Sequence, residues 1–139
     1  MPMKIELKKI GVITSPYFNK DDSPRQGRYS DQISTVTVFN DYVDGLEGLD
    51  KYKYLIILYW QDRAERDKLK VIPHGKKEES GVFSTRAPVR PNPIGFCLVE
   101  LVNVNKNNLT VKWLDALDGS PLLDIKPFWK LDFPDIPEK

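Results

Sequence analysis

The chain has little of two residues on which many protein chemistries depend. It contains one cysteine, Cys97, and one histidine, His74, among 139 residues. These counts exclude an internal disulfide and any metal site built from several cysteines or histidines. A Ser-His-Asp triad or a Cys-His dyad would have to use His74. This histidine lies in the charged stretch 73–80, without nearby residues that would complete such a catalytic group. We therefore expect a surface histidine, a buried thiol in a reducing compartment, and no metal.

The sequence also lacks a charge excess, a long apolar run and the familiar nucleotide-binding fingerprints. Its 21 lysines and arginines against 20 aspartates and glutamates leave a net charge of +1, so only a local basic patch is available for nucleic acid. No stretch is apolar enough for a membrane span or a signal peptide. Neither a GxxxxGK loop nor a GxGxxG turn occurs. We expect a cytoplasmic protein without membrane contact, in which a cofactor or substrate supplies much of the reactivity.

Short apolar and β-branched runs separated by turn residues dominate the chain, which we expect to form one domain over residues 1–139. Asn40 is expected to cap a short helix over residues 41–46, because its side chain can accept a helical N–H. No segment is long enough for the crossover helices of a parallel sheet. The pattern predicts a mainly β fold, a closed or nearly closed β-barrel of short, mostly antiparallel strands with one or two short helices. The expected strands cover residues 5–14, 33–39, 53–60, 96–104, 109–114 and 122–125.

The densest motif runs from Thr85 to Gly95 and reads TRAPVRPNPIG. Proline fixes φ, removes a backbone donor and pushes the preceding residue toward extended geometry, so this segment is neither helix nor central strand. We interpret it as a stiff loop that holds Arg86, Arg90 and Asn92 in fixed directions, since ordering a binding loop in advance preserves affinity. A structural crossover loop with solvated arginines is the alternative.

The stretch PRQG at residues 24–27 also combines recognition groups with a turn residue. Arg25 offers a planar fork of donors for carboxylate or phosphate, and Gln26 both donates and accepts. Glycine permits a close backbone approach. A plain turn is the alternative interpretation.

A third stretch, residues 114–127 (LDALDGSPLLDIKP), holds three carboxylates and a lysine. Asp124 and Lys126 alternate with apolar residues, so they are expected on the same side of a strand, either as a surface ion pair or lining a cleft. A carboxylate-only magnesium site among Asp115, Asp118 and Asp124 also stays open, although the spacing is not diagnostic.

These stretches together resemble the TsaA-like (YaeB-like, TrmO-like) methyltransferases. The shared set is Gly11-Val12-Ile13, then Ser15-Pro16-Tyr17, then the blocks 24–27, 81–95 and 117–127, in the family's order and spacing across nearly the whole chain. The resemblance implies a β-barrel that binds S-adenosylmethionine without a Rossmann-like domain. It further implies methylation of N6 of threonylcarbamoyladenosine beside the tRNA anticodon, and a homodimer with the cofactor near the subunit interface.

The resemblance also implies which residues contact the cofactor. Asp62 and Arg63 occupy a contact region where family members often have histidine. The other implied contacts are Pro24, Arg25, Gln26, Arg86, Leu98, Asp115, Ala116, Leu117 and Asp118.

For the methyl acceptor, the residues suggest a group that holds the adenine amine. The N6 lone pair is delocalised, so an acceptor for its hydrogens would help to position it. Asn92 offers a side-chain oxygen for this role, and Asp124 and Lys126 are further candidates. Local cations for RNA are Arg25, Arg28, Arg63, Arg66, Lys68, Lys70, Lys76 and Lys77.

The chain resembles the short, single-domain members rather than those with an added C-terminal domain that assists tRNA binding. Phosphate contacts normally dominate affinity for nucleic acid, so either a dimer assembles a composite basic surface or the substrate is not tRNA. Two alternatives therefore stand beside the tRNA methyltransferase. One is a methyltransferase of the same fold acting on a small molecule or another RNA. The other is a non-catalytic module that binds S-adenosylmethionine or RNA.

Overall fold

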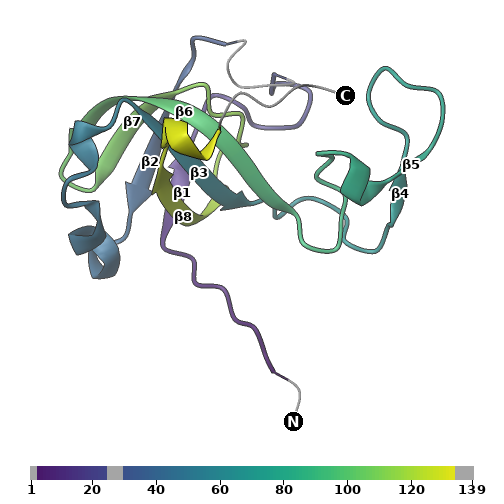
Figure 1. Cartoon of the computed structure of the whole chain (residues 1–139), viewed down its shortest axis with the longest axis horizontal. Helices are drawn as coiled ribbons and strands as arrows, with labels where there is room; N and C mark the ends of the chain where they lie inside the picture. The colour runs from purple at the N-terminus through teal and green to yellow at the C-terminus, as the bar shows by residue number, and fades with distance from the viewer. Residues whose placement is uncertain (1–2, 25–29, 134–139) are drawn as a thin grey trace.

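A closed six-stranded barrel forms the centre of the molecule (Figure 1). The computed structural model describes residues 3–24 and 30–133. The barrel strands follow one another in the order β1-β2-β7-β6-β3-β8, and each pairs antiparallel with its neighbours. The predicted mainly β, closed barrel is therefore confirmed. Its strands are β1 (Gly11–Thr14), β2 (Ile33–Val38), β3 (Tyr54–Trp60), β6 (Ile94–Asn105), β7 (Asn108–Lys112) and β8 (Pro121–Pro127).

The barrel interior is filled by one alternate set of side chains from each strand. On the central strand β3, Leu55, Ile57 and Tyr59 point inward, and β6 contributes Cys97 and Val99. Alternation along a strand sends the intervening residues to the outer face. Burial of this apolar set, at about 25 cal/mol per Å², is the main stabilising contribution to the fold.

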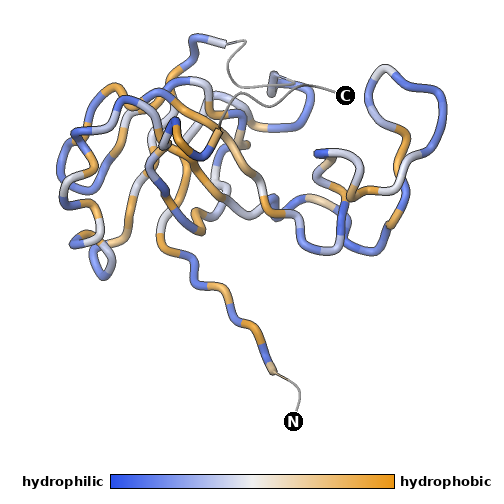
Figure 2. Tube along the Cα trace, viewed as in Figure 1, coloured by the Kyte–Doolittle hydropathy of each residue, from blue (hydrophilic) through white to orange (hydrophobic). Residues whose placement is uncertain are grey.

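The first barrel strand is shorter than predicted. A strand was expected over residues 5–14, but β1 begins at Gly11. At Gly11, where the strand begins, a Cβ would collide with the backbone oxygen of Thr37 on β2. Residues 3–10 instead form an extended arm that leaves the barrel and alternates along its length between hydrophobic and hydrophilic residues (Figure 2).

The hairpin between β6 and β7 is confirmed, and its end shows why β7 is short. Lys106 adopts a positive φ of 56° in the expected asparagine-rich turn. The strand expected over residues 109–114 ends at Lys112, because Trp113 has a φ of 78° that breaks the ladder. Its ring stacks on Tyr54 of β3, with 5.7 Å between the ring centroids.

The described helices are all short 3-10 turns. The expected helix at residues 41–46 is present as η2, but the prediction that Asn40 caps it is wrong, since Asn40 is its first residue and no side chain caps it. No described helix is long and apolar enough to cross a membrane. The described turns are η2 (Asn40–Leu46), η3 (Leu49–Lys51), η4 (Val82–Ser84) and η5 (Lys130–Asp132).

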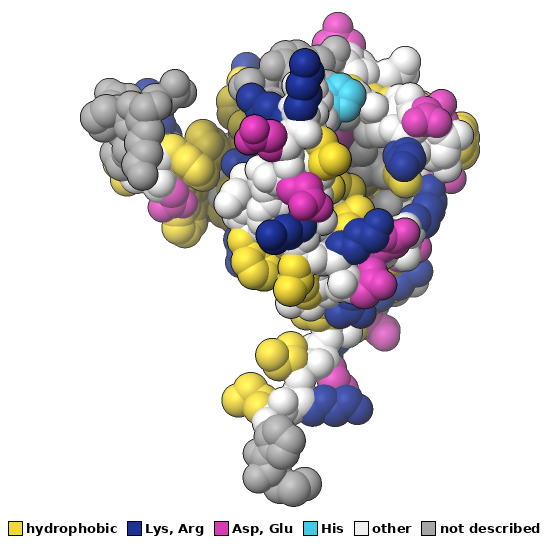
Figure 3. Space-filling model, turned by 90° about the vertical axis from the view of Figure 1, so that its right-hand side faces the viewer, with side chains coloured by type: hydrophobic (Ala, Val, Ile, Leu, Met, Phe, Trp, Pro, Cys, Tyr) yellow, Lys and Arg dark blue, Asp and Glu magenta, His cyan; other side chains and the backbone are white. Residues whose placement is uncertain are grey.

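A lobe of residues 61–93 stands beside the barrel, between β3 and β6 (Figure 1). Its only described strands, β4 (Lys70–Val71) and β5 (Ser80–Gly81), form a small two-stranded sheet. His74 lies exposed in this lobe, as predicted. On the face of the molecule that carries the lobe, basic and acidic side chains interleave around hydrophobic ones (Figure 3).

Candidate functional site

Two of the sequence motifs meet at the rim of the barrel. The Ser15 hydroxyl donates to the Ala116 carbonyl at 2.7 Å, and the Ser15 amide donates to Oδ1 of Asp118 at 3.0 Å. The Asp118 amide in turn donates to the Tyr17 carbonyl at 2.6 Å. The Ser-Pro-Tyr step therefore holds the loop of residues 114–120 in one conformation, with Asp118 acting as a structural acceptor.

Asp115 is the most constrained carboxylate of this rim. The Tyr59 hydroxyl, rising from inside the barrel, donates to its Oδ1 at 2.8 Å. The Ser23 hydroxyl donates to its backbone oxygen at 2.7 Å, which brings Pro24 to the same place. Two other predicted contacts, Arg25 and Gln26, lie outside the described residues.

A neutral donor, the Tyr59 hydroxyl, binds the Asp115 carboxylate. Burial raises the pKa of Asp115, while the hydrogen bond from Tyr59 opposes that shift. Burial, reinforced by the neighbouring Asp115 charge, raises the pKa of Cys97 to about 12 and also raises the pKa of Tyr59. Both groups therefore stay protonated at neutral pH. The Tyr59 hydroxyl donates to the carboxylate, whereas the Cys97 thiol donates to the Trp113 carbonyl at 3.1 Å. Among the described residues, no ion pair involves Asp115.

Tyr59 and Cys97 were not predicted as site residues, because the run KYLIILYW and the neighbours of Cys97 indicate only core. One feature of the sequence could have indicated Tyr59. On the inward face of β3, Tyr59 is the residue with a polar atom, and a buried tyrosine hydroxyl usually finds a partner. That partner could not be identified from sequence, because Asp115 lies 56 residues further along the chain.

Arg63 fastens the rim rather than pointing freely into it. Its guanidinium donates to the Phe18 carbonyl at 3.1 Å and to the Asp118 carbonyl. Two loops that carry site residues are thereby joined through one side chain. Asp62 lies exposed beside it.

The proline-rich block is held over the end of β3 by Arg66. Its Nε donates to the Pro91 carbonyl at 2.8 Å, its terminal nitrogen lies 3.4 Å from Oδ1 of Asn92, and its guanidinium sits 5.0 Å from the Trp60 ring centroid. The Pro93 carbonyl accepts from the Gln61 amide at 2.8 Å. Arg66, predicted as a cation for RNA, thus contacts the backbone and the Asn92 side chain of this block.

The two arginines of the block differ in their surroundings. Arg90 folds back and donates to the carbonyls of Thr85 and Ala87 at 3.0 and 2.9 Å, so it stabilises its own loop. The guanidinium of Arg86 lies 5.9 Å from the Phe96 ring centroid on the outer face of β6. Both described hydrogen bonds of Arg90 come from one terminal nitrogen of its guanidinium.

Four predicted site residues lie on the outer surface of the barrel. Leu98 and Arg86 are on the outer side of β6, whereas Tyr59 and Cys97 beneath Asp115 point inward. Asp124 and Lys126 lie on β8 and form an ion pair of 3.1 Å, so their expected common side is confirmed. The open possibility of a magnesium site is not supported, since the described residues contain no group of three potential metal ligands.

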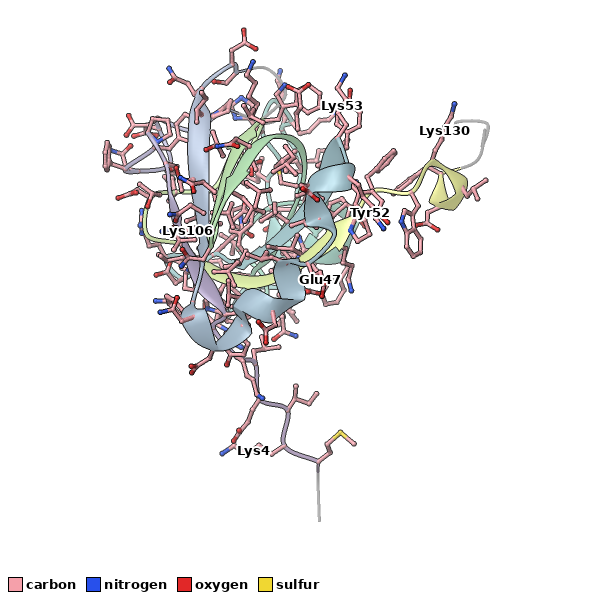
Figure 4. All side chains as sticks on the ribbon, turned by 90° about the vertical axis from the view of Figure 1, so that its left-hand side faces the viewer. Lys4, Glu47, Tyr52, Lys53, Lys106 and Lys130 are labelled. Atoms are coloured by element: carbon pink, nitrogen blue, oxygen red, sulfur yellow. The ribbon has the colours of Figure 1, made fainter. Side chains whose placement is uncertain are left out.

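The hollows of the barrel wall do not coincide with this site. One of about 520 Å³ lies between η2, η3 and the end of β6, and its lining includes Glu47 and Lys106 (Figure 4). A second of about 370 Å³ beside it includes Asp124 as its sole predicted site residue. Asp44 lines both hollows. The chemistry is concentrated at the rim around Asp115, not in these hollows.

Removal of the Tyr59 hydroxyl is expected to destabilise the protein in a pH-dependent way. Because burial raises the folded-state pKa of Asp115, stability falls as pH rises from the unfolded pKa through the folded one. Tyr59→Phe removes a donor that lowers this pKa, so the free energy of unfolding should drop by about 1–3 kcal/mol at pH 7 and by less at pH 4. Urea unfolding at both pH values measures the difference.

Tyr17→Phe is the matched control, because its hydroxyl bonds to a neutral group, the Ser30 hydroxyl, at 2.9 Å. The free energy of unfolding that Tyr17→Phe loses should be the same at both pH values. An equal loss at both pH values for Tyr59→Phe would contradict the assignment of its hydroxyl to an ionised Asp115.

Comparison with known proteins gives concordant matches. The family model described as the tRNA-methyltransferase O N-terminal domain matches residues 12–132. An S-adenosyl-L-methionine-binding protein of Archaeoglobus fulgidus is 55% identical over 88% of either chain. The tRNA (adenine(37)-N6)-methyltransferase of Escherichia coli is 34% identical over 88% of this chain and 57% of its own length. The crystal structure of TrmO from Pseudomonas aeruginosa superposes with a TM-score of 0.81 at 30% identity, covering 99% of this chain and 61% of that one.

Proposed function

The chain belongs to the family of tRNA-methyltransferase O N-terminal domains, and we propose that it transfers a methyl group from S-adenosylmethionine to N6 of threonylcarbamoyladenosine in tRNA. The observation that carries the proposal is the rim around Asp115, where the 114–120 loop, the Ser-Pro-Tyr step and Ser23-Pro24 meet. S-adenosylmethionine is the cofactor that the names of its relatives support. Because the chain spans about 61% of the TrmO structure that it matches, the tRNA substrate and the complete activity are part of the proposal.

The donor set at the rim fits the cofactor chemically. S-adenosylmethionine presents an ammonium group, ribose hydroxyls and a carboxylate. With Oδ1 engaged by Tyr59, Asp115 has its other oxygen for an ammonium or a hydroxyl. The carboxylate needs a cation, and Arg86 and Arg25 are the proposed partners. Pro24, Ala116 and Leu117 are the further contacts proposed at this rim.

Catalysis in this proposal rests on alignment. The bound cofactor supplies an electrophilic methyl group, so the protein mainly has to orient the acceptor and exclude water. Asn92 is the proposed acceptor for the hydrogens of the adenine amine, and Arg66 holds its side chain in position. Asp124 and Lys126 already satisfy each other on the outer face of β8, so they are second candidates.

Replacement of Asn92 by alanine should lower turnover by about 100-fold, while the dissociation constant for the cofactor changes by less than about twofold. The reason is that Asn92 is assigned to the acceptor and not to S-adenosylmethionine. Single-turnover methyl transfer and calorimetry measure the two quantities separately. Asn103→Ala, on an exposed residue of β6, is the control. Full turnover in Asn92→Ala would remove Asn92 from the mechanism.

The charge distribution is consistent with a polyanionic substrate. The lobe of residues 61–93 carries eight basic and five acidic residues, a net +3, whereas the rest of the chain carries 13 and 15, a net −2. Arg63 and Arg66 bind backbone oxygens, and Lys68 pairs with Glu65 at 3.0 Å. Lys70, Lys76 and Lys77 are therefore the proposed phosphate contacts of the lobe. A homodimer acting in the cytoplasm would combine two such lobes into one surface.

The proposal is tested by incubating the purified protein with radiolabelled S-adenosylmethionine and total tRNA, with and without the threonylcarbamoyl group. Label in the modified tRNA alone is the expected result. Label in both tRNA pools would identify another nucleotide as acceptor. Cofactor binding without any label would support the alternative of a binding module, for which the name of the Archaeoglobus relative is the supporting observation.

A further inference from the structure

The arm of residues 3–10 is amphipathic, and its apolar side chains remain exposed within the described chain. The apolar residues Met3, Ile5 and Leu7 expose 87%, 80% and 55% of their surface. They alternate with the charged residues Lys4, Glu6 and Lys8. Hydrophobic side chains line one side of the arm and charged ones the other (Figure 3). Lys4 lies far out on the arm, well away from the barrel (Figure 4).

This arrangement is typical of a strand that lacks its neighbour. An alternating segment is stabilised when its apolar side is covered and its backbone groups are paired. The arm is anchored only at its base, where the Ile10 amide donates to the Leu122 carbonyl at 2.9 Å and the Ile10 carbonyl accepts from Phe39 at 2.9 Å. Beyond Ile10, no residue of the arm belongs to the barrel ladder.

A matching apolar row lies on the outer face of β6. Ile94, Phe96 and Leu98 occur at the same spacing of two residues and expose 42%, 49% and 38% of their surface. Leu58 and Trp60 of β3 widen this row into a patch, since they pair with Phe96 and Ile94 on the same face. Single apolar residues scattered over a protein surface are normal, but three exposed apolar side chains in one row form a contiguous patch, which calls for an explanation.

The topology of the barrel separates the arm from the row in its own chain. The arm continues β1, and β6 is three strands from β1 in either direction around the barrel. The arm also runs away from the barrel along its whole length (Figure 1). A second copy of the chain removes this restriction, and a two-fold exchange would cover both arms and both rows at once.

We propose that two copies exchange arms, with Met3, Ile5 and Leu7 of one copy packed on Ile94, Phe96 and Leu98 of the other. This inference rests on the homodimer proposed above and names the surface that forms it. Because Ile94 directly follows Asn92 and Pro93, the exchanged arm lies beside the proline-rich block of the other copy. Arm exchange would thus couple dimer formation to the order of the loop that carries Asn92.

Cross-linking of two different cysteine variants tests the exchange. Protein carrying Ile5→Cys is mixed with protein carrying Phe96→Cys and treated with a short bismaleimide. The native Cys97 points into the barrel and is buried, so it does not compete. The expected product is a covalent dimer in this mixture. Ile5→Cys alone, and Ile5→Cys mixed with Ile33→Cys on exposed β2, should give none.

Four outcomes would overturn the inference. A covalent dimer of Ile5→Cys alone would show pairing between arms, and a dimer with Ile33→Cys would show another docking face. A dimer in sedimentation that gives no cross-link in the mixture would place the arm elsewhere. If the unmodified protein sediments as a monomer, both the exchange and the proposed dimer fail, while cofactor binding and methyl transfer are measured independently of either.

Polar substitution of the arm gives a second readout. In Met3→Ser/Ile5→Ser/Leu7→Ser the dimer dissociation constant should rise at least about 100-fold, and circular dichroism should retain the barrel spectrum, because the arm lies outside the core. A triple variant with an unchanged dissociation constant would contradict the exchange.

Discussion

Asp115→Asn should lose S-adenosylmethionine binding while remaining folded, with a free energy of unfolding at pH 7 at least equal to that of the unmodified protein. The substitution keeps the shape and the oxygen that accepts from Tyr59. It removes the charge available to the cofactor, and a charged hydrogen bond is worth about 1.5–3 kcal/mol, or roughly a 10- to 150-fold weaker affinity. Calorimetric titration and urea unfolding measure the two effects.

The stability half of this prediction follows from the sign of the pKa shift. Since the pKa of Asp115 is raised in the folded state, ionising it costs stability as pH rises above its unfolded value. Asparagine removes that cost, so the variant should lose this component of the pH dependence. Asp50→Asn, on an exposed residue of η3, is the control for charge alone. Unchanged cofactor affinity in Asp115→Asn would place the cofactor somewhere else.

Gly95→Ala is expected to destabilise the barrel by about 2–4 kcal/mol, through overpacking and loss of a buried hydrogen bond. A Cβ at Gly95 would lie 2.5 Å from Cε1 and 2.7 Å from Cε2 of Tyr59, the residue opposite it on β3. The ring must move, and its hydroxyl then leaves Asp115. Thermal unfolding should show a midpoint lower by roughly 10 °C, and cofactor affinity should fall in parallel.

Gly81→Ala is the matched control, because a Cβ there would meet nothing within 4 Å and its φ is −63°. Its free energy of unfolding should change by less than about 0.5 kcal/mol. If Gly95→Ala kept the stability and cofactor affinity of the unmodified protein, the packing of Tyr59 on Gly95 could not be what positions Asp115.

The barrel was predictable because its strands are locally encoded. The alternation in β2, the apolar run of β3 and the asparagine turn before β7 each specify an element on their own. The prediction failed at the arm, where residues 5–10 have strand composition but lack a strand to pair with in the same chain. It also failed at Trp113, whose positive φ ends β7 and whose ring stacks on Tyr54, a residue distant in sequence.

The candidate site was predictable only in part, because composition does not show which polar groups are already used. The motif at residues 114–118 was identified, and the structure places it at the rim. The structure adds that Arg63, Arg66 and Arg90 are engaged by carbonyl oxygens. It also adds Tyr59, which is distant in sequence from Asp115 and acts through a single hydrogen bond. Such long-range partners depend on strand order and register, which no local motif encodes.

Hydrogen exchange with and without S-adenosylmethionine tests most directly whether the rim is the cofactor site. The account predicts slower exchange of the backbone amides of residues 114–118 when the cofactor is present, and unchanged exchange in η2 and η3. Protection concentrated at the hollow between η2, η3 and Lys106, with none at the rim, would contradict it.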